Sequence, residues 1–319
     1  MATIKHFAVL VAGAMSLGMA SQSLARQDLP LEPGQIWTHR NSGIDLPARI
    51  GDLSRTGGTQ FAEAELDVAI SFTRPEAGDA VTFFVFRNTN GVAPVWLAQA
   101  QRSIEGGNSL GAPVLKIAPR AFAPPRQSRT TGLLAAYALT GKAYASTGVA
   151  MFPVGDWYVK VRATSATRSP EQNVAWMKEL ISALRLPPPA GEPLAAPVAT
   201  CAAPLKGQAA TQSPATSGAG ISRPAARMTA QLWCRDGVFG DNRAVYRPTG
   251  TSDRYLLAMG DNGNALSVQG EGDYYSVNFV TAALTYALPP QGKLPAPSDA
   301  LAILDEGRAI GTFATWSPR

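Results

Sequence analysis

Residues 80–87 read AVTFFVFR, and this stretch predicts the architecture of the first half of the chain. Side chains alternate between the two faces of a strand, which places Val81, Phe83 and Val85 together on one face. The two phenylalanines that alternate with them lie on the opposite face. A strand that is apolar on both faces is typical of the centre of a sheet, with other elements packed on each side. We therefore expect residues 80–87 to form a central strand.

The segments around this strand predict an antiparallel sheet flanked by helices. Apolar residues alternate from Leu66 to Phe72, and a turn at 76–79 connects this segment to residues 80–87. The spacing of apolar residues over 95–104 is helical. Further strands are expected at 130–140, 143–153 and 157–163.

A second helix is predicted near the end of this half. Ser169 is a suitable N-cap, Pro170 fits the first turn, and Glu171 favours the positive end of the helix dipole. Apolar residues from Val174 to Leu184 form one stripe, which predicts a face packed on the core. This half is therefore predicted to be α+β, with an antiparallel sheet flanked by helices.

The segment from Pro187 to Pro224 differs in composition from the rest of the chain. It is dominated by Ala, Pro, Gly, Thr and Ser, and it has too little apolar surface to offset the entropy lost on ordering. We interpret it as a linker. The predicted organisation is a signal peptide at 1–25, an α+β domain at 26–188, a linker at 189–224 and a mainly β domain at 225–319.

The mainly β domain is predicted from its turns. The stretches 260–263 and 270–273 are rich in Gly, Asp and Asn, which is typical of hairpin turns. One short helix is expected to start near Pro297 and to end before Gly307. Strands are expected at 227–235, 243–246, 255–259, 265–269, 275–281 and 308–316.

The N-terminus predicts export. Lys5 and His6 precede an apolar run at 7–19, and small residues at 23–25 fit a signal peptidase site with cleavage after Ala25. No later run approaches the 18 apolar residues of a spanning helix. We therefore expect a periplasmic or secreted protein without a membrane span.

Cys201 and Cys234 are predicted to form one structural disulfide. An even number of cysteines in a chain bound for an oxidising compartment indicates pairing. A metal site with two cysteines would lack partner ligands, and a redox pair is normally spaced Cys-x-x-Cys.

The net charge of +5 at pH 7 comes from scattered basic residues, most of them arginines. Because the chain is predicted to be exported, we do not expect a nucleic-acid partner. One proline-rich loop at 119–129 holds Arg120, Arg126 and Arg129, which are candidates to bind an anionic lipid headgroup or polysaccharide. The alternative is that they are solvated loop residues, and we favour it.

The sequence lacks the common catalytic and cofactor-binding motifs. It contains no Gly-x-Ser-x-Gly, no phosphate-binding loop and no Gly-x-Gly-x-x-Gly. Removal of the signal peptide would leave His39 as the one histidine, which excludes histidine clusters for metals. We interpret His39 as a surface or turn residue rather than a catalytic base. No catalytic residue, metal site or cofactor is predicted.

Three carboxylates form the one acidic cluster of interest. Glu63, Glu65 and Asp67 have a period of two, so a strand through them would align all three on one face. Such a cluster is suited to binding Ca²⁺ or to raising one pKa for general-acid catalysis. The alternative, which we favour, is a charged solvent face that discourages pairing between sheet edges.

Four segments of the first half carry a family resemblance. They are LPARIGDLSR at 46–55, the strand at 68–72, DAVTFFVF at 79–86, and WYVKVRAT at 157–164 before the last helix. Their order resembles exported proteobacterial proteins of unknown function and, more distantly, the PsbP/Mog1-like α/β/α sandwich. The resemblance covers residues 40–187. It implies an accessory or binding role rather than catalysis.

Together these features predict an exported protein that acts by binding, as an accessory factor of the cell envelope. Its expected partner is an envelope protein or polysaccharide. One alternative is a carboxylate-dependent envelope hydrolase. The other is a structural envelope protein that contacts anionic lipid or polysaccharide.

Overall fold

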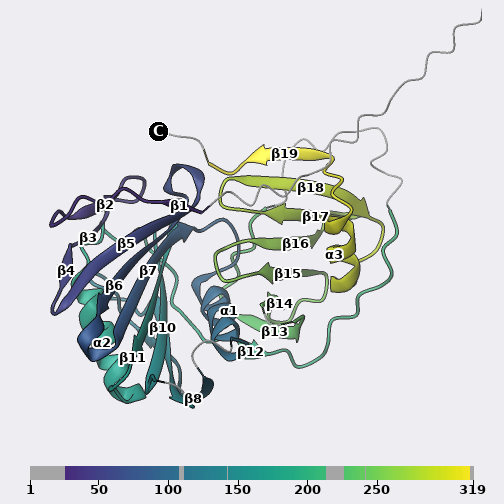
Figure 1. The fold of residues 1–319 in the computed structure, drawn as a ribbon. Coiled ribbons are helices and arrows are strands. Elements are labelled where there is room, and N and C mark those ends of the chain that lie inside the picture. Colours follow the sequence, from purple (N-terminus) through teal and green to yellow (C-terminus); the bar gives the residue numbers. More distant parts are fainter. Residues whose placement is uncertain (1–25, 108–110, 142, 213–225, 241, 317–319) are drawn as a thin grey trace, which may run out of the picture.

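The stretch at 80–87 lies in the middle of a large antiparallel sheet, as predicted (Figure 1). It belongs to β7 (Asp79–Arg87), which pairs with β6 (Asp67–Arg74) on one side and β11 (Trp157–Ser165) on the other. The computed structural model describes residues 26–107, 111–141, 143–212, 226–240 and 242–316.

Nine strands form this first sheet. Their order is β1-β5-β6-β7-β11-β10-β9-β8, with β4 also paired to β5, and each pairing is antiparallel. The strands predicted at 66–72, 130–140, 143–153 and 157–163 correspond to β6, β9, β10 and β11. The remaining bounds are β1 (Gln27–Asp28), β4 (Arg49–Ile50), β5 (Leu53–Ala62), β8 (Ala112–Phe122), β9 (Gly132–Thr140) and β10 (Ser146–Val154), with a separate hairpin of β2 (Trp37–His39) and β3 (Ile44–Leu46).

The strands β5 and β8 are not predicted from the sequence. The pairing register of each strand shifts twice, so neither keeps a regular alternation of apolar residues. The strand β5 contains Gly57 and Gly58, and β8 contains Pro113 and Pro119. Because β8 lies at the edge of the sheet, prolines are tolerated there without loss of a central ladder hydrogen bond.

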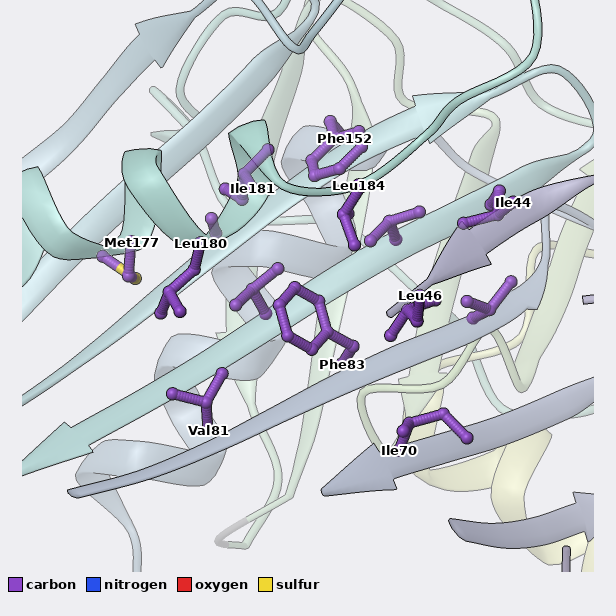
Figure 2. Packing of buried hydrophobic residues seen from close by; sticks show 14 of the residues in the cluster. Ile44, Leu46, Ile70, Val81, Phe83, Phe152, Met177, Leu180, Ile181 and Leu184 are labelled. Carbon is purple, nitrogen blue, oxygen red and sulfur yellow. The ribbon is translucent and has the colours of Figure 1, made fainter. Parts of the chain in front are cut away.

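One face of the first sheet is covered by α2 (Pro170–Ser182) and the β2–β3 hairpin (Figure 2). Leu180 of α2 and Phe83 of β7 belong to the same buried apolar cluster. At the start of α2, the Ser169 Oγ accepts a hydrogen bond from the Gln172 N–H at 3.3 Å, and the Gln172 Oε1 accepts one from the Ser169 N–H at 2.9 Å. The predicted cap and apolar stripe are therefore confirmed.

The other face is covered by α1 (Ala93–Glu105), which lies between the first sheet and a second sheet (Figure 1). Trp96 of α1 is fully buried in a cluster with Phe86 of β7. The same cluster includes Tyr246 and Leu256 from the second sheet. Both faces of β7 are thus covered, and one apolar cluster contains residues of both sheets.

The second sheet has eight strands in sequence order, from β12 to β19. The pair β12–β13 is parallel and the other pairs are antiparallel, while α3 (Pro297–Asp305) packs against the apolar cluster of this sheet. The turns predicted at 260–263 and 270–273 do connect neighbouring strands. The bounds are β12 (Ala199–Thr200), β13 (Trp233–Val238), β14 (Arg243–Pro248), β15 (Arg254–Met259), β16 (Ala265–Gly270), β17 (Tyr275–Val280), β18 (Leu284–Gln291) and β19 (Gly311–Ala314).

The described fold is mostly β, with three α-helices and several antiparallel sheets. The likeness to an α/β/α sandwich stays a prediction, as does the division into domains at 26–188 and 225–319. The predicted signal peptide at 1–25 lies outside the described residues. Within the residues that are described, no helix is long and apolar enough to cross a membrane.

The described part of the predicted linker, 189–212, makes contacts with the second sheet. A disulfide joins Cys201 to Cys234, as predicted, and β12 pairs with β13 beside it. Further along, the Leu205 N–H donates to the Asp236 carboxylate at 2.8 Å. These contacts fasten this segment to the edge of the second sheet.

We predict that replacing both cysteines with alanine lowers the free energy of unfolding by about 3–4 kcal/mol. The expected cause is the entropy that the unfolded chain regains when the loop between the two cysteines is opened. The measurement is urea unfolding of the oxidised wild type and of the double variant. An unchanged midpoint would contradict the prediction.

Candidate functional site

Two neighbouring pockets meet at the turn between β10 and β11. The first has a volume of about 510 Å³ and the second of about 310 Å³, which are sizes typical of sites for small ligands. Gly155 and Asp156 line both pockets, so this turn forms a wall that they share. The rest of the first pocket comes from the β2–β3 turn, the end of β7, residues 187–188 and residues 315–316.

Arg87, the last residue of β7, is the half-buried cation of the first pocket. Its Nη2 donates to the Thr315 carbonyl at 3.0 Å, and its guanidinium lies 5.5 Å from the ring centroid of Trp157. Burial lowers the pKa of Arg87, an effect that the charge of Asp156 opposes. Among the described residues, no carboxylate lies within ion-pair distance of Arg87, and its buried Nε has no hydrogen-bond partner.

Arg40 is the second cation of the first pocket and lies in the β2–β3 turn. Its side chain is 60% exposed, and its Nε is 3.6 Å from the Glu65 Oε1. The turn itself is fixed by Asn41, whose Nδ2 donates to the Ala64 carbonyl at 2.6 Å. Arg40 therefore keeps an exposed guanidinium on a firmly positioned turn.

Aromatic and acidic groups complete the first pocket. Trp157 is buried, whereas Trp316 is half-buried and packs against the core of the first sheet. Asp156 is exposed in the shared wall. The first pocket thus combines two guanidinium groups with indole surface and one exposed carboxylate.

Arg227 and Glu192 of the second pocket are already engaged within the chain, whereas Asp156 of the shared wall is exposed. Arg227 donates to the carbonyl oxygens of Asn88 at 2.9 Å and Gly91 at 3.1 Å, and also contacts the Asn88 side chain. Glu192 is buried, and its carboxylate accepts hydrogen bonds from the N–H groups of Gly155 at 3.0 Å and Ala190 at 3.1 Å. The remaining lining is largely uncharged, with several prolines and Leu194.

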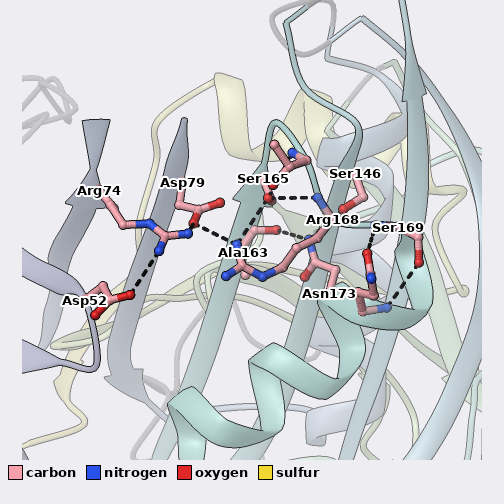
Figure 3. A network of polar contacts seen from close by, with 11 residues as sticks. Asp52, Arg74, Asp79, Ser146, Ala163, Ser165, Arg168, Ser169 and Asn173 are labelled. Atoms are coloured by element: carbon pink, nitrogen blue, oxygen red, sulfur yellow. Dashed lines mark hydrogen bonds and ion pairs between the residues drawn. The ribbon is translucent and has the colours of Figure 1, made fainter. Parts of the chain in front are cut away.

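A buried carboxylate elsewhere shows how this chain neutralises guanidinium groups (Figure 3). The Asp79 Oδ2 accepts from the Arg74 Nη2 at 2.6 Å and from the Arg168 Nη1 at 2.7 Å. Burial raises the pKa of Asp79, but hydrogen bonds, led by the one from Arg168, outweigh burial and hold this pKa below its usual value. Arg87 differs because the described residues provide no such carboxylate.

The structure does not gather the three arginines of the basic loop in either pocket. All three are exposed, Arg120 on β8 and the other two in the loop after it. The Arg126 Nη1 donates to the Leu186 carbonyl at 2.9 Å, beyond the end of α2, whereas the charge of Arg120 acts on Glu171 in the first turn of α2. Anion binding by Arg120, Arg126 and Arg129 stays a prediction.

No strand runs through the three carboxylates. Glu63 and Glu65 lie in a short 3₁₀ turn between β5 and β6, where Ala64 has φ 55° and Glu65 has φ 60°. Asp67 begins β6, is buried, and accepts a hydrogen bond from the Asn262 Nδ2 at 3.0 Å. The three carboxylates therefore do not share one face of a strand.

His39 is fully buried, so its interpretation as a surface residue is wrong. Its Nδ1 is 2.7 Å from the Ser42 Oγ, and its Nε2 is 2.8 Å from the Glu65 carbonyl. The ring packs edge-on against Trp157 at 4.4 Å between centroids. His39 holds the β2–β3 hairpin against the β5–β6 turn and thereby supports the rim of the first pocket.

The residues that line the first pocket could not be identified from any motif in the sequence. Arg40, Arg87, Asp156 and Trp316 come from four segments that are far apart in the sequence. The one available signal was Arg87 itself, a cation that directly follows the apolar run at 80–86. Within the described ranges, no group of three His, Cys, Asp or Glu side chains is placed to hold a metal ion.

In comparisons with known proteins, no family model, curated protein or solved structure matches the chain.

We expect the buried side chains of His39 and Asp67 to change stability in opposite directions as the pH changes. Burial lowers the pKa of His39 from 6.5 to about 4, although the hydrogen bond to the Glu65 carbonyl opposes this change. Stability from neutral His39 is therefore lost as pH falls through this range. Burial raises the pKa of Asp67 from 3.8 to about 6, against the hydrogen bond from Asn262. Stability from protonated Asp67 is lost as pH rises through that range.

We predict that Asp67→Asn makes the stability of the protein more sensitive to acid, because only the effect of His39 then remains. Between pH 6.5 and 4.5 this variant should lose about 2 kcal/mol more of its free energy of unfolding than the wild type, because the compensating protonation of Asp67 is gone. His39→Gln should shift the pH dependence in the opposite direction. Urea unfolding at several pH values measures both effects, and parallel pH profiles for all three proteins would contradict the prediction.

Proposed function

We propose that this chain is an exported envelope protein that binds an anionic ligand in the first pocket and acts as a binding or accessory factor. The observation that carries this proposal is the half-buried guanidinium of Arg87, which has no carboxylate partner among the described residues and lies in the same pocket as the exposed Arg40. Arginine presents several donors in a fixed geometry that suits carboxylates and phosphates.

The electrostatics of the pocket support an anion. Partial burial makes the charge of Arg87 costly, so a ligand that supplies negative charge would stabilise it. The pair of arginines around Asp79 is an internal example of the same chemistry, with one carboxylate held by two guanidinium groups.

The cellular location is part of the proposal. The sequence of residues 1–25 supports export, and the disulfide between Cys201 and Cys234 fits an oxidising compartment. We propose a periplasmic or secreted protein whose partner is an envelope polysaccharide or protein. The accessory role implied by the PsbP/Mog1-like resemblance agrees with a protein that binds rather than catalyses.

No observation favours the two alternatives. A hydrolase that uses Glu63, Glu65 and Asp67 would need these carboxylates to converge, whereas Asp67 is buried and accepts a hydrogen bond from Asn262. Contact with lipid through the basic loop would need a gathered cationic surface. The described contacts instead place Arg126 and Arg120 near opposite ends of α2.

We predict that Arg87→Gln and Arg40→Gln each weaken the binding of D-glucuronate by at least about tenfold, because each removes a charge that faces the ligand. The matched control is Arg120→Gln, which removes an exposed arginine outside both pockets. Titration calorimetry at low ionic strength measures the affinities, and D-glucuronate serves as a carboxylate probe.

The same titrations are repeated with inorganic phosphate and sulfate. Absence of binding for every anion at millimolar concentration would contradict the proposed function. Equal affinities for the wild type and both pocket variants would also contradict it.

A further inference from the structure

The two pockets share one wall, the turn between β10 and β11. Strands β10 and β11 pair up to Val154 and Trp157, which leaves only Gly155 and Asp156 in the turn between them. Both turn residues are exposed and line both pockets. An elongated ligand can therefore pass over this turn and place one part of itself in each pocket.

The first pocket suits an acid that also carries hydroxyl groups. Arg40 and Arg87 supply the donors for a carboxylate, and Trp316 supplies an aromatic surface for an apolar ring face. The exposed carboxylate of Asp156 is an acceptor for hydroxyl donors. The same carboxylate repels a small, highly charged anion, which favours a sugar acid over inorganic phosphate.

The second pocket suits an uncharged unit. Its cation, Arg227, is occupied by oxygen acceptors of the chain, and its buried carboxylate, Glu192, is occupied by two backbone N–H groups. Thr229 and Gln231 remain as exposed polar lining, beside the apolar surface of Leu194. An anionic ligand group would find no unengaged cation among the described lining residues of this pocket.

From this contrast we infer that the ligand is a linear saccharide in which an acidic sugar is followed by a neutral one. The acidic unit lies in the first pocket between Arg40 and Arg87, the chain crosses the turn at Asp156, and the neutral unit lies in the second pocket. This inference rests on the proposed function, since it specifies the anion of the first pocket.

The test compares three soluble probes with the mature chain by titration calorimetry. They are D-glucuronate, a hyaluronan tetrasaccharide in which glucuronate alternates with N-acetylglucosamine, and neutral chitotetraose. We expect the hyaluronan tetrasaccharide to bind at least about tenfold more tightly than either other probe, because only it offers a charged and a neutral unit together.

Two variants assign the binding to the two pockets. Ala190→Trp, at an exposed position that lines the second pocket, should reduce the affinity for the tetrasaccharide to that for glucuronate. The matched control is Ala123→Trp, at an exposed position outside both pockets, which should bind like the wild type. Asp156→Asn should weaken binding of the tetrasaccharide, because it removes a charged acceptor for hydroxyl groups, and should strengthen binding of inorganic phosphate, because it removes the repulsive charge from the wall.

Several outcomes would overturn the inference. If glucuronate binds as tightly as the tetrasaccharide, or if Ala190→Trp has no effect, the second pocket takes no part and only the proposed anion binding survives. If chitotetraose binds as tightly as the hyaluronan tetrasaccharide, the acidic unit is not recognised. If phosphate binds but no saccharide does, the inference fails while the proposed function stands.

Discussion

Burial of both faces of β7 is the constraint on which the rest of the structure depends. On one face Phe83 packs in the cluster that contains α2, and on the other Phe86 packs with Trp96 of α1. Because β7 is paired on both edges and covered on both faces, its last residue is held in a fixed place. That residue is Arg87, and the first pocket is built around it.

The first pocket forms where the ends of the second sheet meet the first sheet. Arg87 donates to Thr315, which follows β19, and Lys160 of β11 forms an ion pair with Asp261 at 2.8 Å. Asn262, beside Asp261, donates to Asp67 at 3.0 Å. These contacts join residues more than 100 positions apart, so the pocket exists only when both sheets are in place.

Patterns within single elements could be predicted from the sequence. The alternation at 80–87 located the centre of the first sheet, and the cap at Ser169 located α2. The turn at Ala64 and Glu65, whose φ values are positive, was not predicted, because backbone conformation decided the outcome there. Sequence patterning could not show this because neither residue is a type that favours such a conformation.

The residues of the candidate site could not be predicted from the sequence, for a different reason. Its residues come from separate segments, and they meet only through tertiary packing. His39 illustrates the same limit, because two of the groups that bury it, the Glu65 carbonyl and Trp157, are far away in the sequence. The disulfide between Cys201 and Cys234 could be predicted because the prediction needed only an oxidising compartment and an even number of cysteines.

The end of β7 is proposed to position the Arg87 guanidinium so that it binds an acid. A crystal structure of the mature chain with bound D-glucuronate tests this directly. We expect its carboxylate within hydrogen-bond distance of Arg87 or Arg40 in the first pocket. Glucuronate bound elsewhere, with the first pocket holding only water, would contradict it.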